Sequence, residues 1–207
     1  MKVIAPSELD FAVEVLNRGG LAVFPTDTLY GLGGNAYSSN AVSRVFECKG
    51  RRPDKPIGVC YPSLDRAAAD VVITEELRRL AEKFLPGALT LILKKSSSSK
   101  LSPFCSNTES GVGIRIPDND IVLDLLRRLD FPLTATSANK SGEPPPKNAN
   151  EAYACLQNYK GDLVIIDGDS CALGSASTII DLCAPVPKIV RKGPGYEKFM
   201  PLLSNNC

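Results

Sequence analysis

The chain has 207 residues, of which 43% are hydrophobic and 23% charged, as is typical of a globular protein with one well-packed domain. Its 24 basic and 23 acidic residues leave a net charge of +1, which excludes a strong overall field for nucleic acid, so any anion site must be a local cluster of cations. The sequence contains no histidine, which excludes Ser-His-Asp and Cys-His catalysis and histidine metal sites.

The first half of the chain alternates predicted helices with short predicted strands. Apolar residues at helical spacing indicate the helices, and short apolar runs indicate buried strands. In chain order we expect a helix between Ser7 and Gly19, a strand at 21–24, a helix capped by Asn40, a strand at 57–61, a helix capped by Thr74 and ended by Pro86-Gly87, and a strand at 89–93 whose one polar residue is Thr90.

The second half adds strands that follow one another more closely. After a polar, low-complexity segment at 96–99, which is typical of a mobile loop, we expect a strand at 112–116 with Arg115 on its non-core face, a helix capped by Asp118 or Asn119, a strand at 133–136, a helix capped by Asn148, and strands at 163–166, 177–182 and 188–191. About seven strands mixed with about five helices favour one α/β domain on a mixed sheet over a purely parallel, doubly wound fold.

The cysteines and the chain ends indicate a compartment. Seven cysteines are widely spaced without a C-x-x-C pair, so we expect neither a zinc ribbon nor a redox motif. The N-terminus does not resemble a signal peptide, and no apolar run approaches the length of a membrane span. We therefore expect reduced cysteines in a cytoplasmic protein that has no membrane partner.

The stretch from residue 25 to residue 56 carries the strongest functional signal. It begins with P-T-D-T-L-Y-G-L directly after a buried strand and ends, one helix later, with K-G-R-R-P-D-K-P. Lys49, Arg51, Arg52 and Lys55 place four cations close together, which predicts a site for phosphate groups. An ordinary solvated basic loop is the alternative, and no G-x-x-x-x-G-K-[ST] phosphate loop occurs.

Further polar groups are expected at strand ends, where mixed α/β proteins commonly bind ligands. The segment T-S-A-N-K-S-G at 136–142 leaves a strand, S-A-S-T at 175–178 enters one, and Arg191 ends another. Each also has an ordinary interpretation, since serine and asparagine cap loops and a surface arginine needs no ligand.

Taken together and in this order, these segments resemble the YrdC-like family, the threonylcarbamoyl-AMP synthases. The matching motifs are P-T-D-T-L-Y-G-L at 25–32, K-G-R-R-P-D-K-P at 49–56, L-P-G-A-L-T-L-I-L at 85–93, G-V-G-I-R-I-P-D at 111–118, P-L-T-A-T-S-A-N-K-S-G-E-P at 132–144, G-S-A-S-T-I-I-D-L at 174–182 and I-V-R-K-G at 189–193. The resemblance covers nearly the whole chain, and the chain resembles the short, single-domain form of the family.

The resemblance implies a fold and an activity. It implies a single α/β domain, expected over residues 1–200 with a short C-terminal tail at 201–207, whose twisted mixed sheet is flanked by helices and carries a large concave basic cleft. The implied enzyme is a nucleotidyltransferase that condenses L-threonine, bicarbonate and ATP into threonylcarbamoyl-AMP and pyrophosphate, for modification of tRNA. Mg2+ would arrive with ATP without protein ligands, the product would pass to a threonylcarbamoyl transferase, and tRNA is a further expected partner.

The resemblance also assigns roles to residues. It places L-threonine against Thr28, Cys60, Arg115, Ala135 and Ser177, with Arg115 pairing the carboxylate. It places ATP against Lys49, Arg51, Lys55, Ser137, Asn139, Pro145 and Arg191, with Lys49 and Arg51 as the catalytic cations. Two positions depart from the family pattern: Arg52 follows Arg51 before the proline, and Cys60 stands where many members carry a histidine.

Two other functions remain open from the sequence. The same basic face would suit a non-catalytic module that binds double-stranded RNA or tRNA, although the near-neutral charge and the few aromatic residues provide little electrostatic attraction or base stacking. An unrelated phosphate-binding α/β protein is the other alternative. For the segment 96–102 two alternatives are open, a lid over the site or a free loop.

Overall fold

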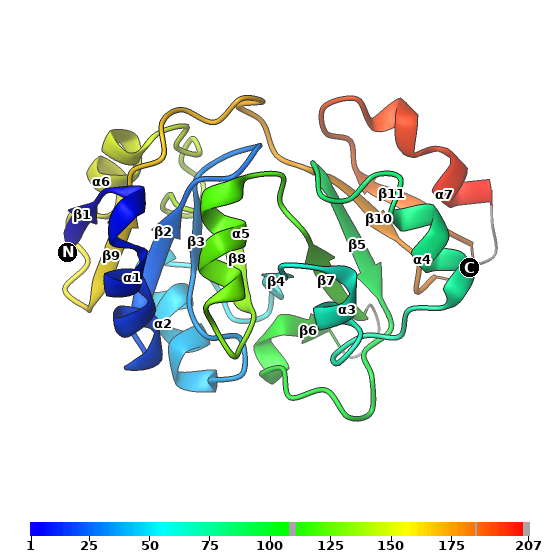
Figure 1. Ribbon diagram of the computed structural model, residues 1–207, viewed down its shortest axis with the longest axis horizontal. Helices are drawn as coiled ribbons and strands as arrows, with labels where there is room; N and C mark the ends of the chain where they lie inside the picture. Colours follow the sequence, from blue (N-terminus) through cyan, green and yellow to red (C-terminus); the bar gives the residue numbers. More distant parts are fainter. Residues whose placement is uncertain (108–110, 185, 205–207) are drawn as a thin grey trace.

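One mixed β-sheet runs through the molecule and forms its frame (Figure 1). The computed structural model describes residues 1–107, 111–184 and 186–204. The strands pair in the order β1-β9-β2-β3-β8-β4-β7-β5-β10-β11, and β6 pairs with β7 outside this row. Their bounds are β1 Lys2–Ile4, β2 Leu21–Phe24, β3 Gly31–Gly33, β4 Gly58–Cys60, β5 Leu89–Leu93, β6 Ser106–Asn107, β7 Gly111–Arg115, β8 Leu133–Ser137, β9 Leu163–Ile166, β10 Thr178–Asp181 and β11 Lys188–Arg191.

The sheet contains both kinds of strand pairing. β1 and β2 run parallel to β9, β4 runs parallel to β7, and β5 runs parallel to β10. The other neighbours in the row are antiparallel. The expectation of a single α/β domain on a mixed sheet is confirmed.

The sequence patterns indicate about seven strands, and the sheet has more than that. β1 has only three residues, and β3 is mostly glycine, which is depleted in strands. The close approach of β8 requires glycine in β3, because a Cβ atom on Gly33 would collide with the carbonyl oxygen of Thr134. The tertiary packing, and not local propensity, therefore makes this segment a strand.

Short polar side chains cap five of the helices. The helices are α1 Leu9–Asn17, α2 Ser39–Lys49, α3 Leu64–Ala67, α4 Glu75–Ala81, α5 Asp120–Arg127, α6 Ala149–Leu156 and α7 Pro201–Ser204, with 3-10 turns η1 Pro6–Glu8, η2 Pro103–Cys105 and η3 Tyr196–Phe199. The capped helices are α2 to α6. Thr74, Asn119 and Asn148 cap their helices as expected, through backbone N–H groups of the first turn. The cap predicted at Asn40 is wrong: Ser38 accepts the N–H of Ala41, and the helix begins one residue before Asn40.

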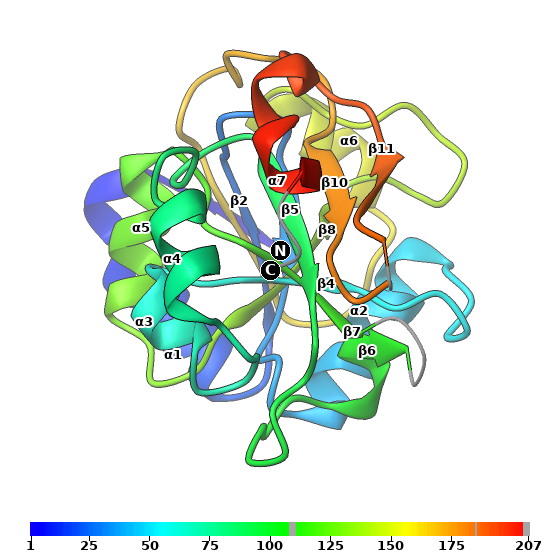
Figure 2. The same cartoon turned by 90° about the vertical axis from the view of Figure 1, so that its right-hand side faces the viewer.

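Helices cover both faces of the part of the sheet that contains β2. The side chains of this strand alternate, so that Leu21 and Val23 join one hydrophobic core while Ala22 and Phe24 join a second. α1 and α5 lie on one side of the sheet and α2 and α6 on the other (Figure 2). Burial on both faces explains why the strand is an unbroken apolar run.

The C-terminal segment expected to form a tail begins with α7. Leu202 of this helix is buried in the larger core, next to Phe199 of η3. The rest of the expected tail, residues 205–207, lies outside the described residues.

Candidate active site

A cavity of about 430 Å³ lies over the central strands. Alternate residues of a strand face the same side, so three neighbouring strands line the cavity with pairs two residues apart. These pairs are Gly58 and Cys60 of β4, Gly113 and Arg115 of β7, and Ala135 and Ser137 of β8. The first member of each pair has little or no side chain, which leaves room for a ligand above the sheet.

The turn after β2 is held rigidly by one threonine. The Thr26 hydroxyl donates to the carbonyl oxygen of Leu29 at 2.6 Å and accepts the N–H groups of Thr28 and Leu29, each at 3.1 Å. Its single proton is thereby used, so the Thr28 hydroxyl, 2.9 Å away, donates to Thr26. The oxygen of Thr28 is left as an acceptor that faces the cavity.

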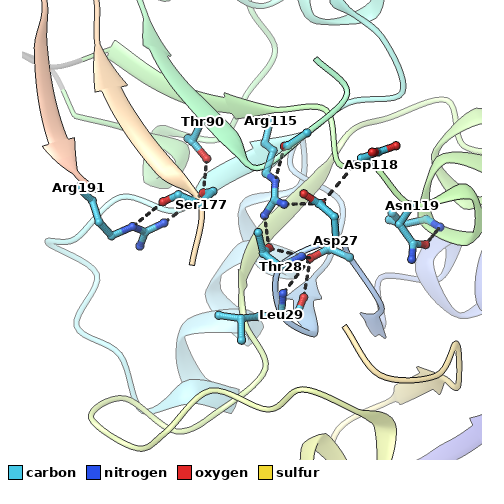
Figure 3. Close-up of polar contacts among 12 residues, drawn as sticks. Asp27, Thr28, Leu29, Thr90, Arg115, Asp118, Asn119, Ser177 and Arg191 are labelled. Atoms are coloured by element: carbon cyan, nitrogen blue, oxygen red, sulfur yellow. Dashed lines mark hydrogen bonds and ion pairs between the residues drawn. The ribbon is translucent and has the colours of Figure 1, made fainter. Parts of the chain in front are cut away.

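Arg115, at the end of β7, meets this turn (Figure 3). Its guanidinium group donates to the Thr28 hydroxyl at 2.6 Å, to the Asp27 carboxylate at 2.5 Å and to the Gly87 carbonyl oxygen at 3.3 Å. Only 12% of the Arg115 side chain is exposed. A planar guanidinium group fixed in this way is suited to bind a carboxylate ligand in a defined orientation.

A second polar cluster lies across the cavity from Arg115. The Ser177 hydroxyl is 2.9 Å from the hydroxyl of Thr90 on β5, and Arg191 of β11 donates to the Ser177 carbonyl oxygen at 2.9 Å and to its hydroxyl at 3.2 Å (Figure 3). Burial lowers the pKa of Arg191, and the positive charge of Arg115 lowers it further. Two guanidinium groups that repel each other in one cavity favour an anion between them.

The loop between α2 and β4 contributes Arg51 to the cavity wall. Its guanidinium group donates to the carbonyl oxygens of Lys55 at 3.3 Å and Pro56 at 3.1 Å, which folds the loop back on itself. Burial lowers the pKa of Arg51, against the opposing effect of Asp54. Lys55 itself is exposed and is not part of the wall of this cavity.

Lys49, the last residue of α2, is placed differently from the sequence-based expectation. Its side chain is buried, and its ammonium group donates to the Ser137 carbonyl oxygen, to the Asn139 carbonyl oxygen at 2.8 Å and to the Asn139 side-chain oxygen at 3.2 Å. All three N–H bonds are thus directed at the end of β8 and the loop after it, and Lys49 does not line the cavity. Burial, and then the charge of Arg51, lower its pKa to about 8.

Cys60 lies on the cavity floor, where only 1% of the residue is exposed. Burial raises the pKa of its thiol to about 12, although the charge of Arg115 acts in the opposite direction. The thiol therefore stays protonated near neutral pH and is neither a base nor a nucleophile there.

All but two of the site residues expected from the sequence line this cavity. They are Thr28, Arg51, Cys60, Arg115, Ala135, Ser137, Asn139, Pro145, Ser177 and Arg191. Lys49 supports the wall from behind, and Lys55 contributes a backbone oxygen to Arg51. The side-chain nitrogen of Asn139 is also engaged within the loop, because it donates to the carbonyl oxygens of Lys140 and Glu143.

Thr90, Glu143 and Asp27 are among the residues that the structure adds to the sequence-based site. Thr90 and Glu143 line the cavity, and Asp27 holds Arg115. A signal for Thr90 was present, because it is the one polar residue in the apolar run of β5. Glu143 lies in the S-G-E-P motif, and Asp27 in P-T-D-T, but neither spacing shows which way the side chain points.

The serine-rich loop is attached to the body of the protein. The buried carboxylate of Asp70 accepts the Ser99 hydroxyl at 2.9 Å and the Lys100 N–H at 3.1 Å, and it also accepts the hydroxyls of Tyr37 and Tyr61. Residues 96–102 do not line the cavity.

The described residues contain neither a cluster suited to a metal ion nor a helix suited to a membrane. No three His, Cys, Asp or Glu side chains within residues 1–107, 111–184 and 186–204 gather where they could hold a metal ion. In the same part of the chain, every helix is too short or too polar to cross a membrane.

Known proteins resemble the chain in both sequence and structure. The threonylcarbamoyl-AMP synthase of Pyrococcus abyssi is 37% identical over 188 residues, which cover 90% of this chain and 54% of the archaeal protein. The threonylcarbamoyl-AMP synthase of Mus musculus is 37% identical over 206 residues, covering 93% of this chain and 69% of the mouse protein. The crystal structure of P. abyssi Sua5 complexed with L-threonine superposes with a TM-score of 0.88 at 34% identity, over 97% of this chain and 61% of that one.

These similarities show the family of the chain and how much of a longer relative it matches. The chain spans about half the length of its Pyrococcus abyssi relative. The profile of the family Sua5_yciO_yrdC, described as "Telomere recombination", matches residues 14–193, and so covers most of the fold described above. The chain therefore belongs to the Sua5/YciO/YrdC family.

Proposed function

We propose that the chain condenses L-threonine, bicarbonate and ATP into threonylcarbamoyl-AMP and pyrophosphate. The observation that carries this proposal is that one cavity is lined both by the fixed guanidinium group of Arg115, with Thr28 and Ser177, which would bind a carboxylate, and by Arg51 with Ser137, which would bind phosphate. Relatives that are 37% identical are named threonylcarbamoyl-AMP synthases, and the similar P. abyssi structure contains L-threonine.

L-Threonine would lie over β4, β7 and β8. Its carboxylate would bind the fixed guanidinium group of Arg115, and its remaining polar groups would meet the hydroxyls of Thr28 and Ser177. Cys60 and Ala135 would form the floor beneath it.

ATP would occupy the other end of the same cavity. Arg51, Ser137, Asn139 and Pro145 line it there, with Lys55 on the neighbouring exposed loop. Arg191, which is hydrogen-bonded to Ser177 at the amino-acid end, would meet the phosphates from that side. Lys49 would act through the loop after β8, which its ammonium group holds in place, and not by direct contact with phosphate. Mg2+ would enter as part of the substrate, bound to the phosphates of ATP.

The chemistry requires alignment and charge neutralisation more than a side-chain base. The amine of L-threonine takes up CO2 from bicarbonate, which releases water and leaves a carbamate. A carbamate oxygen then attacks the α-phosphorus in line and forms the new O–P bond, while the bond to the β-phosphate breaks and pyrophosphate leaves. Such a nucleotidyl transfer is compatible with a chain that lacks histidine and whose cavity cysteine stays protonated.

Pyrophosphate release tests the proposal. With purified protein and MgATP, release should require both L-threonine and bicarbonate, and omission of either should reduce it to the rate measured without protein. Trapped threonylcarbamoyl-AMP, identified by mass spectrometry, should accumulate in step with pyrophosphate. ATP turnover that is indifferent to L-threonine would rule the function out.

The proposed product indicates which partners the protein would have. We propose that threonylcarbamoyl-AMP passes to a transferase that modifies tRNA in the cytoplasm, and that the basic loop at 49–56 helps tRNA to bind. The alternative, a non-catalytic module for double-stranded RNA, is not favoured because the relatives above are named as synthases. Salt-sensitive tRNA binding without pyrophosphate release would reverse this preference.

A further inference from the structure

A buried ion pair lies directly behind the substrate cavity. The Asp27 carboxylate accepts a hydrogen bond from the Arg115 guanidinium group at 2.5 Å, and only 11% of the Asp27 side chain and 12% of the Arg115 side chain are exposed. The same Asp27 oxygen accepts the backbone N–H of Asp118 at 3.2 Å, and the Asp27 carbonyl oxygen accepts the N–H of Leu173 at 3.0 Å. Asp27 is thus fixed by three separate segments of the chain.

Asp27 and Arg115 face different spaces. Arg115 lines the substrate cavity, whereas Asp27 does not. Asp27 instead lines a second cavity of about 380 Å³, together with Asp118 and Lys198. Figure 3 shows the Asp27 carboxylate between Arg115 and Asp118, on the far side of Arg115 from Ser177. A ligand in the substrate cavity would touch Arg115 but not Asp27.

Arg115 uses some of its N–H bonds within the protein and keeps the others for a ligand. A guanidinium group has about five N–H bonds, and Arg115 directs three of them at Asp27, Thr28 and Gly87 within the described residues. The plane of the group is thereby fixed before any ligand binds. The other N–H bonds remain for a substrate carboxylate, whose orientation then follows from this plane.

The negative charge of Asp27 has a separate effect. Arg115 and Arg191 both line the substrate cavity, and their repulsion already contributes to the lowered pKa of Arg191. Without Asp27, the uncompensated charge of Arg115 would favour movement of its side chain away from Arg191 and toward solvent. An uncharged hydrogen-bond acceptor at position 27 would not offset this repulsion.

We propose that Asp27 is the positioning residue for Arg115, and that it sets the orientation of the substrate carboxylate through an ion pair made from outside the substrate cavity. This inference rests on the proposed function for the identity of the substrate. The position of Arg115 itself is independent of that function.

Kinetics of two variants test the positioning role. Asp27→Asn keeps an acceptor oxygen and removes the charge, and we expect the KM for L-threonine to rise about tenfold while the KM for ATP and kcat stay within about twofold of wild type. Asp27→Ala should raise the KM for L-threonine further. The matched control is Asp118→Asn, which removes a carboxylate from the same second cavity but leaves the backbone N–H that Asp27 accepts, and it should behave as wild type.

A second measurement separates this inference from the proposed function. Phenylglyoxal modifies accessible arginines, and the rate at Arg115, followed by peptide mass spectrometry, should be several-fold higher in Asp27→Asn than in Asp118→Asn. An unchanged rate, an unchanged or lower KM for L-threonine, or an equal rise in both KM values would overturn the positioning role. Faster modification of Arg115 in a protein whose wild type needs no L-threonine would support the ion pair and reject the proposed function.

Discussion

At the scale of single residues, burial changes what a charged side chain can do. Lys49 lies in a basic motif typical of phosphate binding, yet its ammonium group is enclosed by the oxygens of Ser137 and Asn139. A buried cation is tolerated only where its N–H bonds are all satisfied. Lys49 therefore stabilises the end of β8, where Ser137 lies, and the loop that follows it. Arg51 is left as the cation of this motif that reaches the cavity.

The lowered pKa of Lys49 predicts a dependence of stability on pH. Its pKa falls from 10.5 to about 8 on folding, so between these values the unfolded chain binds more protons at Lys49 than the folded chain. Raising the pH through this window should therefore stabilise wild type relative to Lys49→Met, and below pH 8 the difference should be constant.

Urea denaturation at two pH values measures this effect. Between about pH 8 and about pH 9.5 the difference in unfolding free energy, wild type minus Lys49→Met, should rise by about 2 kcal/mol at most. Taking the difference cancels the other titrating groups, which both proteins share. A difference that does not change with pH would show that Lys49 titrates alike in the folded and unfolded chains.

At the scale of elements, glycines on two strands of the same sheet have opposite roles. Gly33 of β3 is required for close packing, because a side chain there would collide with the backbone of β8. Gly113 of β7 is not, since an added Cβ atom would meet the Thr90 Cγ2 atom at 3.6 Å and the Gly58 Cα atom at 3.8 Å, which are ordinary contact distances. Gly113 lies on the floor of the cavity, and its missing side chain provides space for a ligand.

Alanine substitutions should separate these two roles. Gly113→Ala should fold with a melting temperature close to that of wild type but should raise the KM for L-threonine about tenfold, because the new methyl group occupies the cavity floor. Gly33→Ala should lose about 2 kcal/mol or more of stability because the sheet must shift. Thermal melting and steady-state kinetics distinguish them, and a Gly113→Ala enzyme with an unchanged KM would contradict this account of the floor.

At the scale of the whole molecule, the fold brings distant segments to the two ends of one cavity. The proposed amino-acid end combines the turn after β2 with the end of β7 and the residue before β10, and the proposed phosphate end combines the loop after α2 with the end of β8 and the loop after it. Thr28 contacts Arg115 at the first end, whereas Arg51 stands at the second. The two ends should therefore be separable by mutation.

Thr28→Ala and Arg51→Ala test this separation. Thr28→Ala removes the hydroxyl that accepts an Arg115 N–H at 2.6 Å, and it should mainly raise the KM for L-threonine, by about tenfold. Arg51→Ala removes a cation from the phosphate end and should mainly raise the KM for ATP. Equal effects of both variants on the same substrate would show that the two ends do not act separately.

The sequence alone determined the class of the fold and most of the cavity wall. Helical spacing and polar caps located α4, α5 and α6, because a cap is a local interaction between a side chain and the next turn. Short, mainly apolar runs located β2, β5 and β9, because the burial of such a run is also visible in local sequence. The ordered motifs, taken together, indicated the family and placed Thr28, Arg115 and Ser177 in one site.

Only the tertiary structure decided what depends on contacts between distant residues. β1 and β3 are strands because β9 and β8 lie beside them, not because of their own propensity. The inward direction of Lys49 depends on the loop after β8, and the ion pair of Asp27 with Arg115 joins the turn after β2 to the end of β7. Motif spacing shows which groups are present, but their direction and burial are set by packing, and these decide whether a charge binds a ligand or holds another side chain in place.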